Sequence, residues 1–396
     1  MLLSRHETAS GLNWRAAALL GLITSTFSTV VATLGAARIG RDAAVDWMVV
    51  AAIPLRDQAL QAEPSWAVIL AGILFHQWAD FSWAVFFFGL LGRWTAGLRP
   101  WSIALIAVPW AVLTSATEWL FLVPIFPFRQ PIFPLEQPYW LGLVVHLISS
   151  SLYPLFPWLR DRLAGRTPSP SVRRFATVWS GLAAVGTLAL AVVAFFGWHH
   201  CEPPHVGSSE RAAYDRSYMR RMAAHHAQGV DIATLAAGKV QDPHLRALAN
   251  LMIAAQKSEI GIFEQWWASW FDDPPRLPPA SPGEHATMPG MLSPEQMAAL
   301  RQASGDAFDP LFVQSMTFHH QGAITMADDA MRHAGDPRLR LMSQAIRHEQ
   351  RGEIELMHGT RGAAATAAAV SSMVAPVGAG TADQRPDGPH GHDGGQ

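Results

Sequence analysis

The C-terminal part of the chain carries one pattern twice, at a constant offset of 94 residues. Met222-x-x-His225-His226 returns as Met316-x-x-His319-His320. The copies also agree in register on both sides of this motif: Asp215 matches Asp309, Ala233 matches Ala327, Asp242-Pro243 matches Asp336-Pro337, and Gln256, Glu259 and Ile260 match Gln350, Glu353 and Ile354. A constant offset over this length indicates a duplicated helix-turn-helix unit, so this part is restricted to two helical hairpins.

Each copy presents one thioether and two imidazoles on adjoining faces of one helix. At 100° per residue, the stripe that holds Met222 and His226 is about 60° wide. Asp215 and Met219 share that stripe; in the second copy it holds Asp309, Met316 and His320, with Val313 in place of Met219. His225 and His319 lie about 80° to one side, within reach of the methionine three residues earlier.

A methionine at helical spacing is also typical of core packing, and a histidine pair of a solvated or capped face. The repetition of the whole motif favours a metal site instead. Di-iron four-helix proteins use Glu-x-x-His, whereas this motif has Met where that Glu would stand. Thioether and imidazole ligands suit Cu(I), and Ag(I) by analogy, better than Fe or Mg. The predicted ligands are Met222, His225, His226, Met316, His319 and His320, with Met219 and Met326 in reserve.

Two further pairs of residues are candidates for supporting these ligands. Asp215 and Asp309 share the stripe of the second histidines, so we expect them to orient those rings. Gln256 and Gln350 each fall on an apolar stripe of the following helix, and a buried amide needs a hydrogen-bond partner. A ligand histidine or the upstream aspartate would serve as that partner.

The repeat region reads as four helices, at about 208–237, 242–270, 306–333 and 336–360. Asp242-Pro243 and Asp336-Pro337 are N-cap and first-turn pairs that begin the second helix of each copy. Between the copies, a proline-rich loop is followed by Ser293 and Gln296, a capping box for a short helix to about residue 303. The Ala/Gly-rich and then polar tail, 361–396, is predicted to be disordered.

Residues 1–198 are predicted to cross a membrane five times. Apolar runs at about 16–37, 65–92, 101–123, 139–159 and 175–198 are long enough to span a bilayer, and tryptophans stand at their ends. With the N-terminus inside, nine arginines fall in cytoplasmic segments and four in the opposite loops. This asymmetry predicts a multi-pass protein of a bacterial cytoplasmic (inner) membrane, with a cytoplasmic N-terminus and a C-terminal domain in the periplasm or otherwise outside the cytoplasm.

Four ionisable residues lie inside these spans: His76, Asp80, Glu118 and His146. Such residues are costly in lipid and usually face a bundle interior, so we expect them to meet. Internal hydrogen bonds that hold the bundle together are one interpretation, and a proton or metal path that opens to the outer face is the other.

The linker 199–207 contains His199-His200-Cys201 and His205, which suit a soft or borderline metal as well as they suit a plain polar connection. Cys201 is the single cysteine, so no internal disulfide can form. A net charge of −2 without a basic run argues against nucleic acid as a partner.

Residues 208–360 resemble the bacterial domain-of-unknown-function family 305. The resemblance rests on Met222-x-x-His225-His226, Met288-Pro-Gly-Met291-Leu-Ser-Pro-Glu-Gln296-Met, Phe308-Asp309-x-x-Phe312-x-x-x-Met316-x-x-His319-His320-x-Gly322-Ala323-x-x-Met326-Ala327, and Gln-x-x-Glu-Ile in both copies. It implies a ferritin-like four-helix fold and, because some members are exported copper-binding proteins, a metallochaperone or sequestration role. The membrane half lies outside it.

The chain is therefore predicted to be all-α: about five transmembrane helices (1–198), a linker (199–207), a ferritin-like bundle of two helical hairpins (208–360) and a tail (361–396). The predicted function is extracytoplasmic Cu(I) binding at a lipid bilayer, without catalysis. A ferritin-like metal-dependent oxidoreductase is the enzymatic alternative, and needs acidic ligands for which only Glu259 and Glu353 are candidates. A metal-free sensor or interaction module is the other alternative. The metal's stoichiometry, a transport partner and a homo-oligomer are left open.

Overall fold

The computed structural model describes residues 2–199, 202–271 and 276–377, and in these ranges every regular element is helical. This confirms the all-α prediction. The chain divides into two compact units, one made chiefly of Met1–Ala59 and Pro64–Pro203 and the other chiefly of Pro204–Thr360 and Ala367–Gln396. Each unit has its own hydrophobic core.

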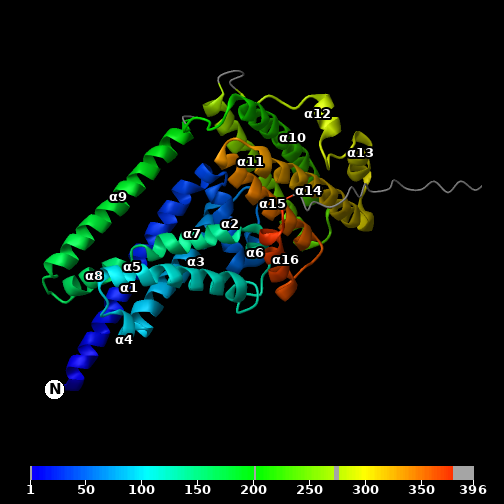
Figure 1. Ribbon diagram of the computed structural model, residues 1–396. Helices are drawn as coiled ribbons and strands as arrows, with labels where there is room; N and C mark the ends of the chain where they lie inside the picture. Colours follow the sequence, from blue (N-terminus) through cyan, green and yellow to red (C-terminus); the bar gives the residue numbers. More distant parts are fainter. Residues whose placement is uncertain (1, 200–201, 272–275, 378–396) are drawn as a thin grey trace, which may run out of the picture. The chain divides into compact units, whose positions relative to one another are not determined.

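The first unit holds the long apolar helices (Figure 1). Its elements are α1 (Leu2–Gly35), η1 (Ala36–Ile39), α2 (Ala43–Leu55), η2 (Arg56–Ala59), α3 (Trp66–Val85), η3 (Phe86–Leu90), α4 (Gly92–Thr95), α5 (Pro100–Thr117), η4 (Glu118–Leu122), α6 (Ile132–Glu136), α7 (Tyr139–Ser150), η5 (Tyr153–Leu155), α8 (Phe156–Leu163) and α9 (Pro170–Trp198). Among the described residues, five segments are long and apolar enough to cross a membrane, as predicted: Gly11–Ile39, Trp66–Leu90, Pro100–Leu122, Tyr139–Leu163 and Pro170–Trp198.

Close backbone approach and aromatic stacking hold this unit together. A Cβ on Gly72 of α3 would lie 2.0 Å from the Trp47 carbonyl oxygen, so only glycine lets α2 pack this closely. Phe88 stacks on Phe156 with 3.9 Å between ring centroids. By contrast, none of the most apolar stretch of α9 is buried within the protein, as expected of a helix at the edge of a membrane bundle.

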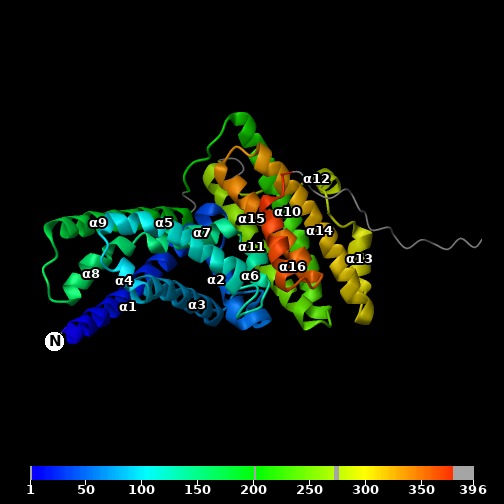
Figure 2. The same ribbon diagram turned by 60° about the horizontal axis from the view of Figure 1, so that its bottom comes forward.

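The second unit is a four-helix bundle of α10 (Ser209–Lys239), α11 (Pro243–Trp270), α14 (Phe308–His333) and α15 (Pro337–Met357), which lie side by side in Figure 2. The predicted caps begin α11 and α15: Asp242 accepts a hydrogen bond from the His244 amide at 2.7 Å, and Asp336 accepts one from the Arg338 amide at 2.9 Å. The four predicted helices are thus present with bounds close to those expected.

The first helices of the two hairpins, α10 and α14, run antiparallel. Tyr214, near the start of α10, donates a hydrogen bond of 2.6 Å to Asp329, near the end of α14. At the other end, the amide of Gln241 donates one of 3.1 Å to Asp309 at the start of α14. This direction decides which parts of the two motifs face each other.

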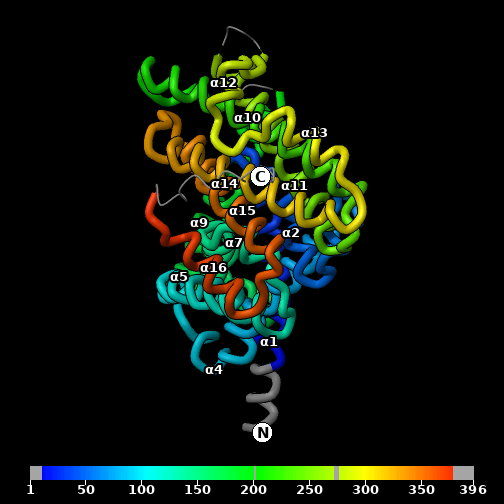
Figure 3. The backbone as a smooth tube through the Cα atoms, turned by 90° about the vertical axis from the view of Figure 1, so that its right-hand side faces the viewer, coloured from blue at the N-terminus to red at the C-terminus, as the bar shows by residue number. Residues whose placement is uncertain are grey.

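The linker between the copies follows the bundle surface (Figure 3) and contains more structure than predicted. The expected short helix is α13 (Pro294–Gln302), and its Ser293–Gln296 capping box is confirmed. A second capping box, Ser281 with Glu284, begins an unpredicted helix, α12 (Pro282–Thr287), and η6 (Gly305–Ala307) precedes α14. The proline-rich stretch was predicted to be a loop, although it contains this Ser-Pro-x-Glu signature of a helix N-terminus.

The start of the tail is also helical, contrary to expectation: α16 spans Gly362–Val374. Its alanine-rich composition has high helix propensity. Arg347 of α15 donates to the carbonyl oxygens of Ala375 and Pro376, the two residues that follow the helix, at 2.9 and 3.0 Å. The rest of the predicted disordered segment, residues 378–396, lies outside the described residues.

Candidate metal centre

The two histidine pairs meet where α10 and α14 cross. His225, His226, His319 and His320 are all completely buried. The His225 and His319 rings face each other with 3.9 Å between centroids and 34° between planes. The His319 Nε2 atom also lies 3.0 Å from the backbone carbonyl oxygen of His225. The motif repeat therefore produces one layer of four imidazoles across the middle of the bundle, called here the histidine layer.

Glycines make room for this layer. A Cβ on Gly229, one turn after His226, would lie 2.1 Å from Oε1 of Gln256 and 2.8 Å from Cε1 of His319. A Cβ on Gly322 would lie 2.1 Å from the carbonyl oxygen of Pro289. The linker backbone can thus press against α14, and the same Pro289 oxygen lies 3.1 Å from Nε2 of His225. The linker covers one histidine of the layer directly.

Each second histidine is paired with a glutamate from the following helix. His226 Nε2 lies 2.9 Å from Oε2 of Glu259, and His320 Nε2 lies 2.7 Å from Oε2 of Glu353. Both carboxyl groups are buried, Glu353 almost completely. These two contacts are the same contact in the two copies, so carboxylate and imidazole pairing is built into the repeat.

Burial decides the charge state of the layer. It lowers the pKa of both His225 and His320 to about 3, and lowers the pKa of His319 well below its ordinary value. Burial, together with the negative charge of Glu259, raises the pKa of Glu353 well above its ordinary value. Near neutral pH the three imidazoles are therefore uncharged, and Glu353 keeps its proton.

Several polar atoms of the layer have no hydrogen-bond partner in the described part of the chain. They include Nδ1 of all four histidines, Nε2 of His226 and His320, and both side-chain polar atoms of Gln256. Leaving a buried polar atom unpaired costs about 1–3 kcal/mol, so such a concentration is unusual. Imidazole nitrogens are suitable donors for a borderline or soft metal ion.

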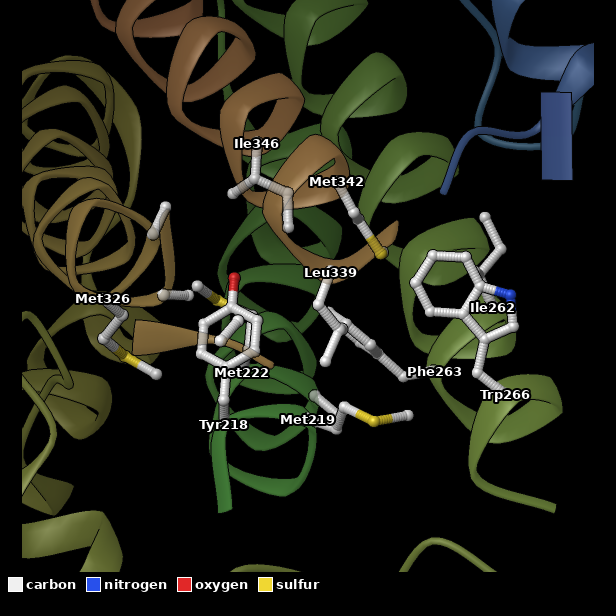
Figure 4. Close-up of a cluster of buried hydrophobic side chains, with 14 of the residues drawn as sticks. Tyr218, Met219, Met222, Ile262, Phe263, Trp266, Met326, Leu339, Met342 and Ile346 are labelled. Carbon is white, nitrogen blue, oxygen red and sulfur yellow. The ribbon is translucent and has the colours of Figure 1, made fainter. Parts of the chain in front are cut away.

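The methionines flank the layer at opposite ends. Met222 and Met316 are completely buried, each three residues before its histidine pair. Because α10 and α14 are antiparallel, these steps of about 4.5 Å run in opposite directions and separate the two levels by about 9 Å. Met222 shares a hydrophobic cluster with Met219, Met326 and Met342, as Figure 4 shows, and Met316 is not in that cluster.

The six predicted ligands are all buried, but they do not lie at one level of the bundle. The sequence spacing is local, and the antiparallel crossing places one thioether at each end of the histidine layer. Met326, a predicted reserve ligand, instead joins Met222 at the same end. Among the residues that the structure describes, no group of three or more His, Cys, Asp or Glu side chains is arranged to hold a metal ion. The donors fit a soft metal in kind, but the rings are engaged in the contacts above.

The comparisons with known proteins concern this bundle. A family model described as "Domain of unknown function (DUF305)" matches residues 215–361. A DUF305 fragment from Deinococcus radiodurans is 30% identical, and the match covers 40% of this chain and 97% of that one, with a TM-score of 0.34. The chain belongs to the DUF305 family. The predicted resemblance is therefore confirmed.

Two other proteins of known structure are similar to the part of the chain that matches this family, called here the DUF305 domain. CopM in its Cu(I)-bound form is 28% identical over 37% of this chain and 93% of that chain, with a TM-score of 0.31, and CopM was also solved in Cu(II)-bound and Ag-bound forms. A putative secreted DUF305 protein from Streptomyces coelicolor is 24% identical over 37% of this chain and 95% of that one, with a TM-score of 0.33. None of the curated proteins matches the chain.

The aspartates of the DUF305 domain do not orient the histidines as expected. Asp215 accepts hydrogen bonds from the amides of Gly335 and Asp336 at 2.8 and 2.9 Å, and lies 2.7 Å from Nε2 of His205. Asp309 likewise accepts from the amides at the start of α11. Asp215 shares a helical stripe with His226, but it is eleven residues, or about 16 Å, away along the axis. Each aspartate instead ties its own copy to the other hairpin.

The glutamines do belong to the histidine layer. Gln256 lies over Gly229 beside His319, and Gln350 donates to Oε2 of Glu353 at 3.3 Å. The glutamates that pair with the histidines were considered in the sequence only as ligands of an enzyme. Their signal was an acidic residue on a buried stripe at the same place in both copies.

The remaining candidate residues lie in the first unit or in the linker. The intramembrane residues form two pairs, His76 with Asp80 and His146 with Glu118, as expected of groups that meet. In the linker, residues 200 and 201 lie outside the described residues, and so do the tail histidines. His205 packs against the rings of Trp270 and Phe271, away from the histidine layer.

Proposed function

We propose that the DUF305 domain binds Cu(I) in order to sequester it or pass it on. The observation that carries the proposal is a fully buried layer of four imidazoles with a fully buried thioether at each end. Soft thioether sulfur and neutral imidazole are the ligands that favour Cu(I) over harder ions. The copper- and silver-bound forms are properties of CopM, and the proposal for this chain rests on its own residues.

The protonation of the layer supports binding near neutral pH. A metal ion competes with protons for its ligands. Because the pKa of His225 and of His320 is about 3, protons do not occupy those nitrogens at neutral pH. Met222 with its own histidine pair and Met316 with its pair would form two related half-sites, with Met219 and Met326 as additional donors at the Met222 end.

A cavity of about 290 Å³ gives the Met222 end a connection to the surface. Its lining includes Tyr218, Pro289 and Met326. Tyr218 and Met326 share the cluster of Met222, and the Pro289 carbonyl contacts His225. An ion that enters this cavity would reach a thioether and the edge of the histidine layer together.

The test replaces Met222 and Met316 together with leucine in the full-length protein in detergent. Leucine keeps the volume and apolarity, so folding should lose less than about 1.5 kcal/mol per site. Competition for Cu(I) against a chromophoric chelator should show an affinity lower by roughly tenfold or more, equivalent to about 1.4 kcal/mol. Met342→Leu is the matched control, because Met342 is equally buried beside Met222 without being a proposed ligand. If the double variant binds Cu(I) like this control, the methionines only fill the core.

One observation favours a second candidate function, a ferritin-like metal-dependent oxidoreductase. Glu259 and Glu353 lie 2.9 and 2.7 Å from histidines of the layer, where a carboxylate-rich metal site would need them. Loading the protein separately with Cu(I), Fe(II) and Zn(II) distinguishes the two functions. If the first proposal holds, the protein binds Cu(I), and Glu259→Gln with Glu353→Gln leaves that binding unchanged. If the second function holds, the protein binds Fe(II), and the same double variant abolishes that binding. A protein that takes up none of these ions would instead be a metal-free interaction module.

We also propose that residues 1–198 anchor the domain in a bacterial cytoplasmic membrane and that 199–207 connect them to a domain at 208–360 outside the cytoplasm. The support is the set of five apolar helices together with nine arginines in the segments assigned to the cytoplasm against four in the opposite loops.

A further inference from the structure

The membrane-spanning unit contains two pairs of ionisable side chains that the copper-binding proposal does not use. His76 and Asp80 come from α3, Glu118 from the first position of η4, and His146 from α7. Of their side-chain surface, 14% is exposed at His76, 13% at His146, 20% at Glu118 and 5% at Asp80. We propose that these two imidazole–carboxylate pairs form a proton-binding site inside the membrane half.

The first pair is connected through a serine. Ser28 of α1 donates its hydroxyl proton to Oδ2 of Asp80 at 2.6 Å, and its oxygen lies 3.0 Å from Nε2 of His76. With its proton directed to Asp80, the serine oxygen accepts from the Nε2–H of His76. When His76 is an imidazolium, its proton can pass to Ser28 while the serine proton passes to Asp80. The products are a neutral imidazole and a neutral carboxylic acid, and no charge is gained or lost.

The second pair holds one proton between its two groups. The Thr114 hydroxyl donates to the carbonyl oxygen of Trp110 at 3.0 Å or of Ala111 at 3.2 Å. Its oxygen therefore accepts from Nδ1–H of His146, 2.9 Å away. In a neutral ring this tautomer would leave Nε2 bare, facing Oε2 of Glu118 at 3.4 Å. Two bare lone pairs repel, so one proton lies between these atoms, on the ring or on the carboxyl group.

Each imidazole–carboxylate pair is therefore neutral when one proton is shared between its two groups. A second proton makes the pair positive, and loss of the shared proton makes it negative. Trp83 Nε1 donates to Oε2 of Glu118 at 3.0 Å, so this carboxyl group also has a neutral donor that does not depend on its protonation. The charges of the two pairs interact, His76 with Glu118 and Asp80 with His146. Tyr153 of η5 also interacts with Asp80. Loading one pair with a proton therefore opposes loading the other.

The placement of the pairs gives the site a direction. Along their helices, Glu118 and His146 lie about 6 and 10 Å from the ends on the side of the 36–65 and 123–138 connections, and His76 lies about 15 Å from that side. The groups lead from near one membrane surface toward the middle. Glu118 also begins a π-helical turn, in which its carbonyl accepts from the Val123 amide at 3.0 Å, and such turns are frequent at functional sites.

Cohesion of the bundle alone does not account for these groups. Replacing a buried ion pair by apolar residues of similar volume is often neutral or stabilising. Ionisable residues within a bilayer are rare and usually mark ion or proton pathways. Two pairs with the same composition, supplied with hydroxyl partners from α1 and α5, fit exchangeable protons better than static packing.

The test uses the full-length protein in liposomes, with the external pH lowered while infrared difference spectra record carboxyl protonation. In the parent, two carboxyl bands should appear on acidification, and Asp80→Asn and Glu118→Gln should each remove one of them. Asp57→Asn, in η2, is the control and should remove neither. Ser28→Ala keeps every ionisable group but breaks the connection between His76 and Asp80, so it should slow the appearance of the Asp80 band without abolishing it.

The proposal is overturned if no carboxyl band changes at any pH at which the parent stays folded, or if Asp80→Asn and Glu118→Gln leave the bands unchanged. If either of those variants fails to fold, Ser28→Ala decides, and an unchanged rate in that variant overturns the relay. Cu(I) affinity should be the same in all of these variants, so the outcome is independent of copper binding.

Discussion

Mild acid should destabilise the DUF305 domain through histidines that the fold keeps neutral. His225 is completely buried, and its pKa in the folded protein is about 3. In the unfolded chain the pKa returns to about 6.5. Between these pH values His225 is protonated in the unfolded chain and neutral in the folded protein. Stability is therefore fully present above about pH 6.5 and is lost as the pH falls toward 3.

The size of the effect follows from that difference. At pH 5 the solution is about 1.5 pH units below the pKa of His225 in the unfolded chain. Protonation there stabilises the unfolded state by about 2 kcal/mol. His319, whose pKa is also lowered by burial, acts in the same direction. His320 and Glu353 together hold one proton in the folded protein, and His320 holds one in the unfolded chain between about pH 4.5 and 6.5, so this pair contributes little there.

The assay is urea denaturation of the fragment 204–396 at pH 7 and pH 5, followed by circular dichroism. We expect the free energy of unfolding to fall by at least about 2 kcal/mol between the two conditions, and His225→Gln to reduce this loss by about that amount. His333→Gln is the control, because the His333 side chain is 57% exposed and lies outside the histidine layer. An unchanged pH dependence in His225→Gln would refute the assignment of a neutral buried ring.

Three other outcomes test the architecture. Asp215→Asn should lower the free energy of unfolding by about 1–3 kcal/mol. The loss should exceed that of Asp309→Asn, because Asp215 is completely buried and also contacts His205. Neither change should alter Cu(I) affinity. Gly229→Ala should lower the free energy of unfolding, measured by urea denaturation, by about 1–3 kcal/mol, because the new methyl group meets Gln256 and His319. Ala323→Gly, at the matched position of the second copy, should lower it by only about 1 kcal/mol. Reporter fusions after residue 198 should be active only outside the cytoplasm, and activity confined to the cytoplasm would reverse the proposed orientation.

Local sequence signals were enough to predict the helices of the DUF305 domain. Capping residues, proline at the first turn and the helical period are all determined within a few residues, and Asp242, Asp336 and Ser293 occupy the predicted cap positions. The five apolar helices were likewise predictable, because bilayer thickness sets their length. The tail helix α16 was not predicted, although its alanine-rich sequence favours a helix, and its contact with Arg347 joins residues distant in sequence.

The contacts between helices could not be predicted in the same way. Helical phase tells which face a residue occupies and says nothing of its height on the partner helix. For that reason Asp215 was assigned to His226, although it reaches the start of α15 instead. The direction of α14 relative to α10 was equally invisible, so the sequence could not show that Met222 and Met316 flank the layer from opposite ends.

The antiparallel duplication explains why the histidines converge while the methionines separate. In a pair of equivalent antiparallel helices, residues at the crossing meet their own counterparts, and residues before the crossing move apart on the two helices. His225 and His319 stand at that crossing, with 3.9 Å between their rings. The linker then makes the copies unequal, since Nε2 of His225 contacts the Pro289 carbonyl and Nε2 of His319 contacts the His225 carbonyl. Two half-sites formed from one repeated motif should therefore differ in affinity, even though their ligands are the same.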